Sequence, residues 1–154
     1  MDQTAHMAAY KVGDSDTRPW GSYVVTRVGA NDAGEDVCEK DITVNSGQVL
    51  SLQSHDHRRE LWRVEKGELT VLLDGVVSTL KEGQSIVVPV GSIHCMANKT
   101  SSPVVVCEVQ EGLCREEDIV RYMDAYGRST VESDDPRVQK SLAAYKNLLE
   151  DVQG

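Results

Sequence analysis

Short runs of β-branched and aliphatic residues, broken at regular intervals by glycine and proline, recur through most of this 154-residue chain. In "ELTVLLDGVVSTL", two such runs flank Asp74-Gly75, a dipeptide typical of a two-residue hairpin turn. Further runs are "SYVVTRV", "VCEKDITVN", "QVLSLQSH", "ELWRVEKG", "QSIVVP" and "PVVVCEVQEG". Seven or eight strands at this spacing predict a mainly β domain, either a sandwich or a barrel.

Helical patterns are confined to the C-terminal part. The segment 115–128, "REEDIVRYMDAYGR", has acidic residues in its first turn and predicts a short helix. Asp135-Pro136 then offers an N-cap followed by proline at the first helical position. The apolar residues that recur at helical spacing after it are Val138, Leu142, Tyr145, Leu149 and Val152. This pattern predicts an amphipathic C-terminal helix.

The chain length fits one domain with a hydrophobic core of its own. We expect residues 1–17 to form a disordered or loosely packed segment and residues 18–128 to form the β domain. Residues 129–154 are expected to form the amphipathic helix, packed on the barrel or on a partner subunit.

Composition excludes several classes of partner. The formal net charge of −9 argues against binding of nucleic acid, because such surfaces neutralise phosphates with lysine and arginine. A local arginine cluster could still hold one small phosphorylated ligand. No apolar stretch reaches the length of a membrane span, and the N-terminus lacks the apolar core of a signal peptide. The four cysteines form no C-x-x-C pair and are expected to be reduced thiols, which predicts a cytoplasmic protein.

Three of the four histidines fall in a pattern that favours a metal site. His55 and His57 are two residues apart, so on a strand both imidazoles would point to the same side. Glu60 opens the next run, and His94 follows a Pro-x-Gly turn much later. Three imidazoles and one carboxylate suit a divalent transition ion. The alternative is a solvated, charged loop with no ligand.

The spacing around these residues resembles that of the cupins. Their second motif is matched without a gap by Gly83, Pro89, Gly91, His94 and Asn98. Their first motif, an H-x-H followed by glutamate and glycine, is matched with one departure. Two residues separate His57 from Glu60, where cupins more often have three or four. The resemblance implies a cupin fold, that is, a double-stranded β-helix or jelly-roll barrel, here with C-terminal helices.

Within the cupins, the chain resembles the isomerase half of type II mannose-6-phosphate isomerases. The segments that carry this resemblance are "RPWGSY", "LSLQSHDHRRELW", "VPVGSIH", "EVQEG" and "EEDIVRYMDAYGR", which lie in order between residues 18 and 128. That family often fuses this domain to a sugar nucleotidyltransferase, whose glycine-rich nucleotide loop we do not find here. The resemblance implies a single-domain enzyme that interconverts mannose 6-phosphate and fructose 6-phosphate through a cis-enediol.

The resemblance also implies roles for individual residues. The implied ligands of one divalent ion (Zn, Mn, Fe, Co or Ni) are His55, His57, Glu60 and His94. The implied catalytic residues are Arg58, Glu108 and Lys40, with Glu108 the candidate general base if its strand face looks inward. The implied substrate contacts are Gln53, Arg18, Arg128 and Gln110, and Gln53 is alternatively a further metal ligand. Lys40, Arg18 and Arg128 are candidates for phosphate contacts. The alternative for all four basic residues is an exposed surface charge or an ion pair that ties the domain together.

Two other functions remain open at this point, because a fold does not fix a function. One is a metal-dependent oxidoreductase of the dioxygenase type, and the other is a non-catalytic cupin that binds a sugar phosphate. We expect a small phosphorylated sugar as substrate and a homodimer as the possible assembly. Neither nucleic acid nor membrane is expected as a partner.

Overall fold

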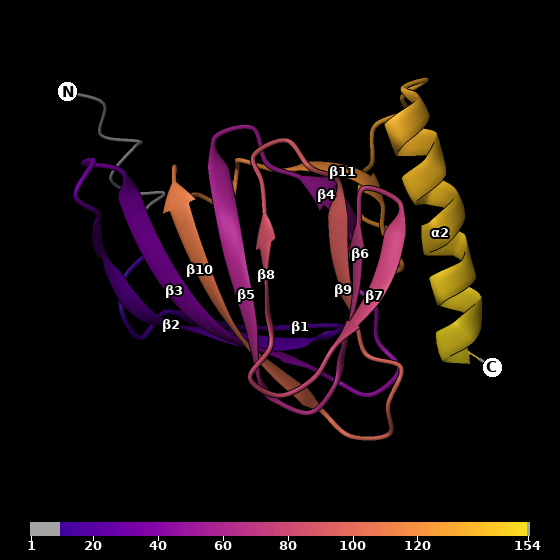
Figure 1. Cartoon of the computed structure of the whole chain (residues 1–154), viewed down its shortest axis with the longest axis horizontal. Helices are drawn as coiled ribbons and strands as arrows, with labels where there is room; N and C mark the ends of the chain where they lie inside the picture. Colours follow the sequence, from indigo (N-terminus) through magenta and orange to yellow (C-terminus); the bar gives the residue numbers. More distant parts are fainter. Residues whose placement is uncertain (1–9, 154) are drawn as a thin grey trace.

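Two antiparallel sheets face each other in the computed structural model, which describes residues 10–153 (Figure 1). The first sheet contains, in order, β1 (Ser15–Arg18), β2 (Gly21–Ala30), β3 (Asp36–Val44), β10 (Val104–Gly112), β5 (Arg58–Lys66) and β8 (Ser85–Val88). The second contains β11 (Val120–Met123), β4 (Leu52–Ser54), β9 (His94–Ala97), β6 (Leu69–Leu73) and β7 (Val76–Leu80). One helix, α2 (Pro136–Gln153), lies outside the second sheet (Figure 1). The predicted mainly β barrel is confirmed.

The inward-facing side chains change from polar to apolar along the central strands. On β5 the buried residues run from Glu60 to Val64, and on β10 they run from Glu108 back to Val104. Because the strands are antiparallel, their polar ends meet, and Gln110 lies opposite Glu60. The apolar end is filled by Trp20, Ile42, Val44, Trp62, Val64, Leu69, Val71, Val88, Met96, Val104 and Val106. One end of the barrel is therefore a hydrophobic core, and the other offers polar groups to a site.

The hairpin predicted at Asp74-Gly75 joins β6 to β7. Both turn residues have positive φ angles, 48° at Asp74 and 82° at Gly75, as a type I′ turn requires. The Asp74 carboxylate also accepts a hydrogen bond of 2.8 Å from the backbone N–H of Ile93, which ties this turn to the segment before β9.

The predicted C-terminal helix begins as its sequence indicates. The Asp135 carboxylate accepts a hydrogen bond of 2.8 Å from the backbone N–H of Arg137, which is an N-cap contact. Along the helix, Tyr145 and Leu148 are buried against the outer face of the second sheet, and the Tyr145 hydroxyl donates to the Leu50 carbonyl over 2.7 Å. The helix therefore packs on the barrel and covers the sheet face that points away from its interior.

The helix predicted over 115–128 was wrong. Val120–Met123 form β11, an edge strand that pairs with β4. The Asp118 carboxylate fixes the approach to this strand, because it accepts the backbone N–H groups of Asp56 and His57 at 3.1 and 3.0 Å. Unpaired backbone groups at a sheet edge favour strand addition, and this long-range pairing outweighs the local acidic signal for a helix.

The loose N-terminal segment was predicted to extend to residue 17, but ordered structure begins before that residue. Ser15–Arg18 form β1, which pairs with β2, and Tyr10 is buried beside Val25. Residues 1–9 lie outside the described residues. The four cysteines are free thiols. In the part of the chain that the structure describes, we find no helix with the length and apolarity that a membrane crossing needs.

Candidate active site

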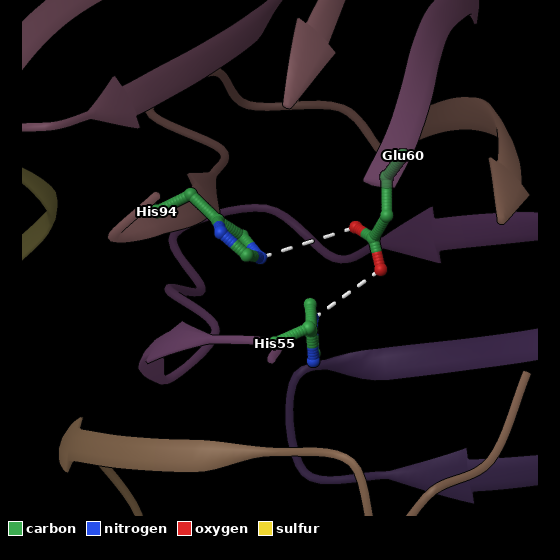
Figure 2. Close-up of side chains that lie close together, drawn as sticks. All are labelled: His55, Glu60 and His94. Carbon is green, nitrogen blue, oxygen red and sulfur yellow. Dashed lines mark ion pairs between the residues drawn. The ribbon is translucent and has the colours of Figure 1, made fainter. Parts of the chain in front are cut away.

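Three side chains from different elements converge at the polar end of the barrel (Figure 2). His55 follows β4, Glu60 lies on β5, and His94 begins β9. The Nε2 atom of His55 is 3.3 Å from Glu60 Oε2, and that of His94 is 3.9 Å from Glu60 Oε1. Ligand atoms that bind one ion at about 2.1 Å lie roughly 3 to 4 Å apart, so this spacing suits a single ion.

The surroundings of both imidazoles leave their Nε2 atoms free to bind a metal ion. Their Nδ1 atoms face backbone carbonyls, that of Asp118 at 2.5 Å from His55 and that of Ser92 at 3.0 Å from His94. An Nδ1–H that donates to these carbonyls leaves Nε2 with a free lone pair toward Glu60, as in many metal sites. Burial lowers the pKa of His55 to about 3 and that of His94 to about 4, so both rings are neutral at pH 7.

The His94 Nε2 atom is buried and has no hydrogen-bond partner among the described residues. Such an atom is costly to bury unless something binds it. Two neutral imidazole nitrogens and a carboxylate are also donors that divalent transition ions accept. These residues therefore fit a divalent metal ion.

Gln53 joins this group from β4. It pairs with His94 across the strands, and its Nε2 atom lies 3.4 Å from His55 Nε2. Four residues separate His55 from Glu60, which is the spacing expected between the second histidine and the glutamate of the first cupin motif. Gln53 then occupies the place of the first histidine. The motif match therefore starts at Gln53, two residues earlier than the sequence analysis placed it.

His57 does not point into the barrel, and that expectation was wrong. Its side chain is 65% exposed, and its Nδ1 atom lies 3.0 Å from Asp118 Oδ1. Residues 55–57 form the turn between β4 and β5, so the alternation of side chains along a strand does not apply to them.

Arg58 is buried beside the ligand group, which contradicts the alternative of a surface charge. Its Nε donates to Glu60 Oε2 over 2.9 Å, and its Nη1 donates to the Arg115 carbonyl over 2.9 Å. Its Nη2 lies 3.3 Å from His55 Nε2. The guanidinium thus contacts two of the three groups that a metal ion would use.

A cavity of about 160 Å³ opens beside Arg58 and Gln53. All the residues predicted to act in catalysis or substrate binding line it: Arg18, Lys40, Gln53, Arg58, Glu108, Gln110 and Arg128. Five of the lining residues are basic and two are acidic, although the chain as a whole carries a charge of −9. This local excess of positive charge suits an anionic small molecule.

Residues 5–124 match a family model described as "Mannose-6-phosphate isomerase C-terminal". The chain belongs to this family. A mannose-1-phosphate guanylyltransferase of Escherichia coli is 42% identical over 112 residues, which cover 72% of this chain and 22% of the relative. The alginate biosynthesis protein AlgA of Pseudomonas fluorescens is 43% identical over 114 residues, or 73% and 23% of the two chains. The chain thus spans less than a quarter of the length of these curated relatives.

Solved structures confirm the cupin fold of this domain. KdgF from Halomonas sp. aligns with a TM-score of 0.58 and 18% identity, over 66% of this chain and 86% of that one. An RmlC-like cupin from Shewanella frigidimarina aligns with a TM-score of 0.51 and 23% identity, over 62% of this chain and 78% of that one. A protein with a double-stranded β-helix domain from Klebsiella pneumoniae aligns with a TM-score of 0.55 and 17% identity, over 79% of this chain and 95% of that one.

Glu108 is the buried acid of the domain's cavity. Its Oε1 accepts the indole N–H of Trp62 over 3.1 Å, and the same N–H lies 2.9 Å from Glu60 Oε1. Its Oε2 accepts a hydrogen bond of 3.0 Å from Gln110. Burial, followed by repulsion from Glu60, raises the pKa of Glu108 to about 7. The inward orientation that the general-base assignment needs is therefore present.

Lys40 faces Glu108 across β3 and β10. Its ammonium lies 3.9 Å from the ring centre of Tyr10 and 4.6 Å from that of Tyr23, in cation–π contact with both. Burial lowers the pKa of Lys40, and the Glu108 carboxylate opposes this shift. The alternative of an exposed surface charge therefore does not hold for Lys40.

Arg18 and Arg128 line the cavity but are already paired with carboxylates. Arg18 lies 2.7 Å from Asp16 and 3.3 Å from Glu116. Arg128 lies 3.0 Å from Asp124, four residues before it. These ion pairs support the alternative of a structural tie at least as well as a direct substrate contact.

Tyr10 and Arg121 are among the cavity residues that sequence reasoning missed. Tyr10 precedes the first predicted strand, and no periodic pattern includes it. Arg121 was concealed by the helix expected over 115–128. Had that segment been treated as a strand, Arg121 would have stood out as a charged residue within a β-type run.

Proposed function

We propose that this domain is a metal-dependent aldose–ketose isomerase that interconverts mannose 6-phosphate and fructose 6-phosphate. One observation carries the proposal: a metal-type ligand group, a buried carboxyl and five basic side chains share one polar barrel end. The family match to residues 5–124 supports the same sugar phosphate chemistry.

The reaction moves a proton between C1 and C2 of the sugar. A divalent ion at His55, Glu60 and His94, with Gln53 beside it, would supply Lewis acidity toward the sugar oxygens. Glu108 accepts the proton from one carbon and returns it to the other. Its location in the cavity wall supports this role, because a general base must reach the carbon-bound hydrogen. The Trp62 and Gln110 donors hold its two oxygens in place.

Arg58 supports the reaction from the other side. It lies between the ligand group and the cavity, where its guanidinium can donate to the sugar oxygens as they gain negative charge. Lys40 adds a second buried positive charge opposite Glu108. The resulting electrostatic field favours an enediol that carries partial negative charge.

A coupled assay of fructose 6-phosphate formation from mannose 6-phosphate tests this function. The metal-free protein is expected to be inactive and to gain activity with at least one of Zn, Mn, Fe, Co or Ni. Activity should disappear again with a chelator. Absence of turnover with all five metals would exclude the isomerase. Oxygen uptake in an iron-loaded sample would indicate an oxidoreductase instead, and sugar phosphate binding without turnover would indicate a binding protein.

A further inference from the structure

Arg121 is a cavity arginine whose Nε atom has no hydrogen-bond partner among the described residues. Its Nε atom is buried and makes no hydrogen bond, and no ion pair joins it to a carboxylate within residues 10–153. The three other arginines that line the cavity, Arg18, Arg58 and Arg128, are each paired with acidic side chains. A buried guanidinium donor without an acceptor costs free energy, so its persistence indicates that an acceptor binds there.

The neighbours of Arg121 make that acceptor an anion. Burial lowers the pKa of Arg121, and the like charges of Arg128 and Arg18 lower it further. Asp124 and Glu116 partly offset this repulsion, yet both already engage other arginines. A bound anion would satisfy the free donor and relieve the repulsion among the three arginines at once.

Strand register places Arg121 at a useful distance from the metal-type ligands. It lies opposite Gln53 on β4, and Gln53 lies opposite His94 on β9. Residues directly opposite on antiparallel strands project to the same face, and neighbouring strands are about 4.8 Å apart. The row therefore spans roughly 10 Å between the backbones of Arg121 and His94. An extended six-carbon sugar phosphate can bridge this distance between its reacting end and its phosphate.

We propose that Arg121 binds the phosphate group of the substrate, with Arg18 and Arg128 flanking it; this assignment rests on the proposed isomerase function. The guanidinium offers the planar pair of donors that matches phosphate oxygens. Arg121 would thereby set the preference of the site for phosphorylated over free sugars. The residues at the other end of the row, which would hold the metal ion, are left to position the oxygens on the reacting carbons.

The test compares the wild-type protein with Arg121→Met, Arg121→Lys and an exposed control, Arg63→Met. Calorimetry with inorganic phosphate measures the subsite directly, and the KM for mannose 6-phosphate measures it during turnover. We expect Arg121→Met to lower the affinity for inorganic phosphate and to raise the KM for mannose 6-phosphate, each by about ten- to hundredfold. Arg121→Lys should change each by about tenfold, and the metal content should stay unchanged in both variants. Arg63→Met should match the wild type. If Arg121→Met does not fold, the Arg121→Lys values decide.

The outcomes separate this assignment from the isomerase function. Phosphate binding that depends on Arg121 in a protein without turnover keeps the anion subsite and removes the isomerase. Turnover with unchanged phosphate affinity and unchanged KM in the Arg121 variants keeps the isomerase and overturns the subsite. Failure of the wild type to bind inorganic phosphate or the sugar phosphate also overturns the subsite.

Discussion

Arg58 and a divalent cation compete for the same lone pairs. The guanidinium donates to Glu60 Oε2 and lies 3.3 Å from His55 Nε2, so an ion bound there meets an adjacent positive charge. Like charges at this separation oppose each other. We therefore expect Arg58 to weaken metal binding, whereas under the proposed function it would assist the substrate, and these two effects can be measured independently.

Replacing Arg58 by alanine is expected to keep or raise metal affinity while it lowers kcat/KM about a hundredfold, the usual effect of losing one charge-stabilising donor. Metal analysis after dialysis and the coupled isomerase assay give the two numbers. Arg59→Ala is the matched control, because Arg59 is paired with Glu35 on the surface. A loss of metal from the Arg58→Ala protein would show that Arg58 assembles the ligand group instead.

The two histidines of the H-x-H sequence are expected to respond differently to substitution. His55→Ala removes a nitrogen that faces Glu60 and should reduce metal affinity by more than about a hundredfold. Loss of a residue that only hydrogen-bonds to a metal ligand has a smaller effect, of about ten- to hundredfold. His57→Ala changes an exposed ring and should leave metal content intact. Equal metal loss from both variants, measured by atomic spectroscopy, would return His57 to the ligand set.

At the scale of elements, local signals predicted local structure. The Asp74-Gly75 turn and the Asp135 cap need only their own neighbours, and both were confirmed. β11 depends on pairing with β4, more than sixty residues earlier, so nothing within 115–128 reveals it. His57 was misplaced for a related reason: the turn that follows Ser54 is held by the Asp118 carboxylate, more than sixty residues later in the chain.

The loop after β11 is closed by one buried carboxylate. Asp124 accepts the backbone N–H of Arg128 at 2.7 Å and two donors of its guanidinium at 3.0 and 3.2 Å. Burial alone would raise the pKa of Asp124, but these contacts lower it below its usual value of 3.8. This "DAYGR" segment thus owes at least part of its sequence to loop architecture.

The lowered pKa of Asp124 predicts a pH-dependent contribution to stability. Because the folded pKa lies below the unfolded one, the stabilisation is fully present above about pH 4 and is lost as the pH falls through the folded value. Asp124→Asn should reduce the free energy of unfolding by about 1–2 kcal/mol at pH 7, and the difference should shrink below pH 4. Urea unfolding at several pH values measures this, with exposed Asp134→Asn as the control. A difference that stays constant down to pH 2 would contradict the assignment.

For the molecule as a whole, the candidate ligands connect the two sheets. Glu60 belongs to the first sheet and His94 to the second, so an ion held by both links them across the barrel end. An ion that binds only the folded chain stabilises it by mass action.

Addition of a suitable transition metal is therefore expected to raise the unfolding temperature. At a free metal concentration about one hundred times Kd the stabilisation is about 2.7 kcal/mol, which corresponds to roughly 5–10 °C for a domain of this size. Differential scanning calorimetry of the metal-free protein measures the shift. Magnesium, which prefers oxygen ligands, serves as the control and should have a smaller effect. An equal shift with magnesium would argue against binding at the imidazoles.

The polar-to-apolar change along β5 and β10 has a consequence for how this domain tolerates insertions and deletions. Each of these strands carries core residues and residues of the candidate site on the same inward face, in one continuous alternation. Removing Cys107 from β10, for example, would reverse the inward and outward faces on one side of the deletion, turning either Val106 or Glu108 outward. A deletion within either strand is therefore expected to disrupt the core or the candidate site, because both depend on the same alternation of side chains.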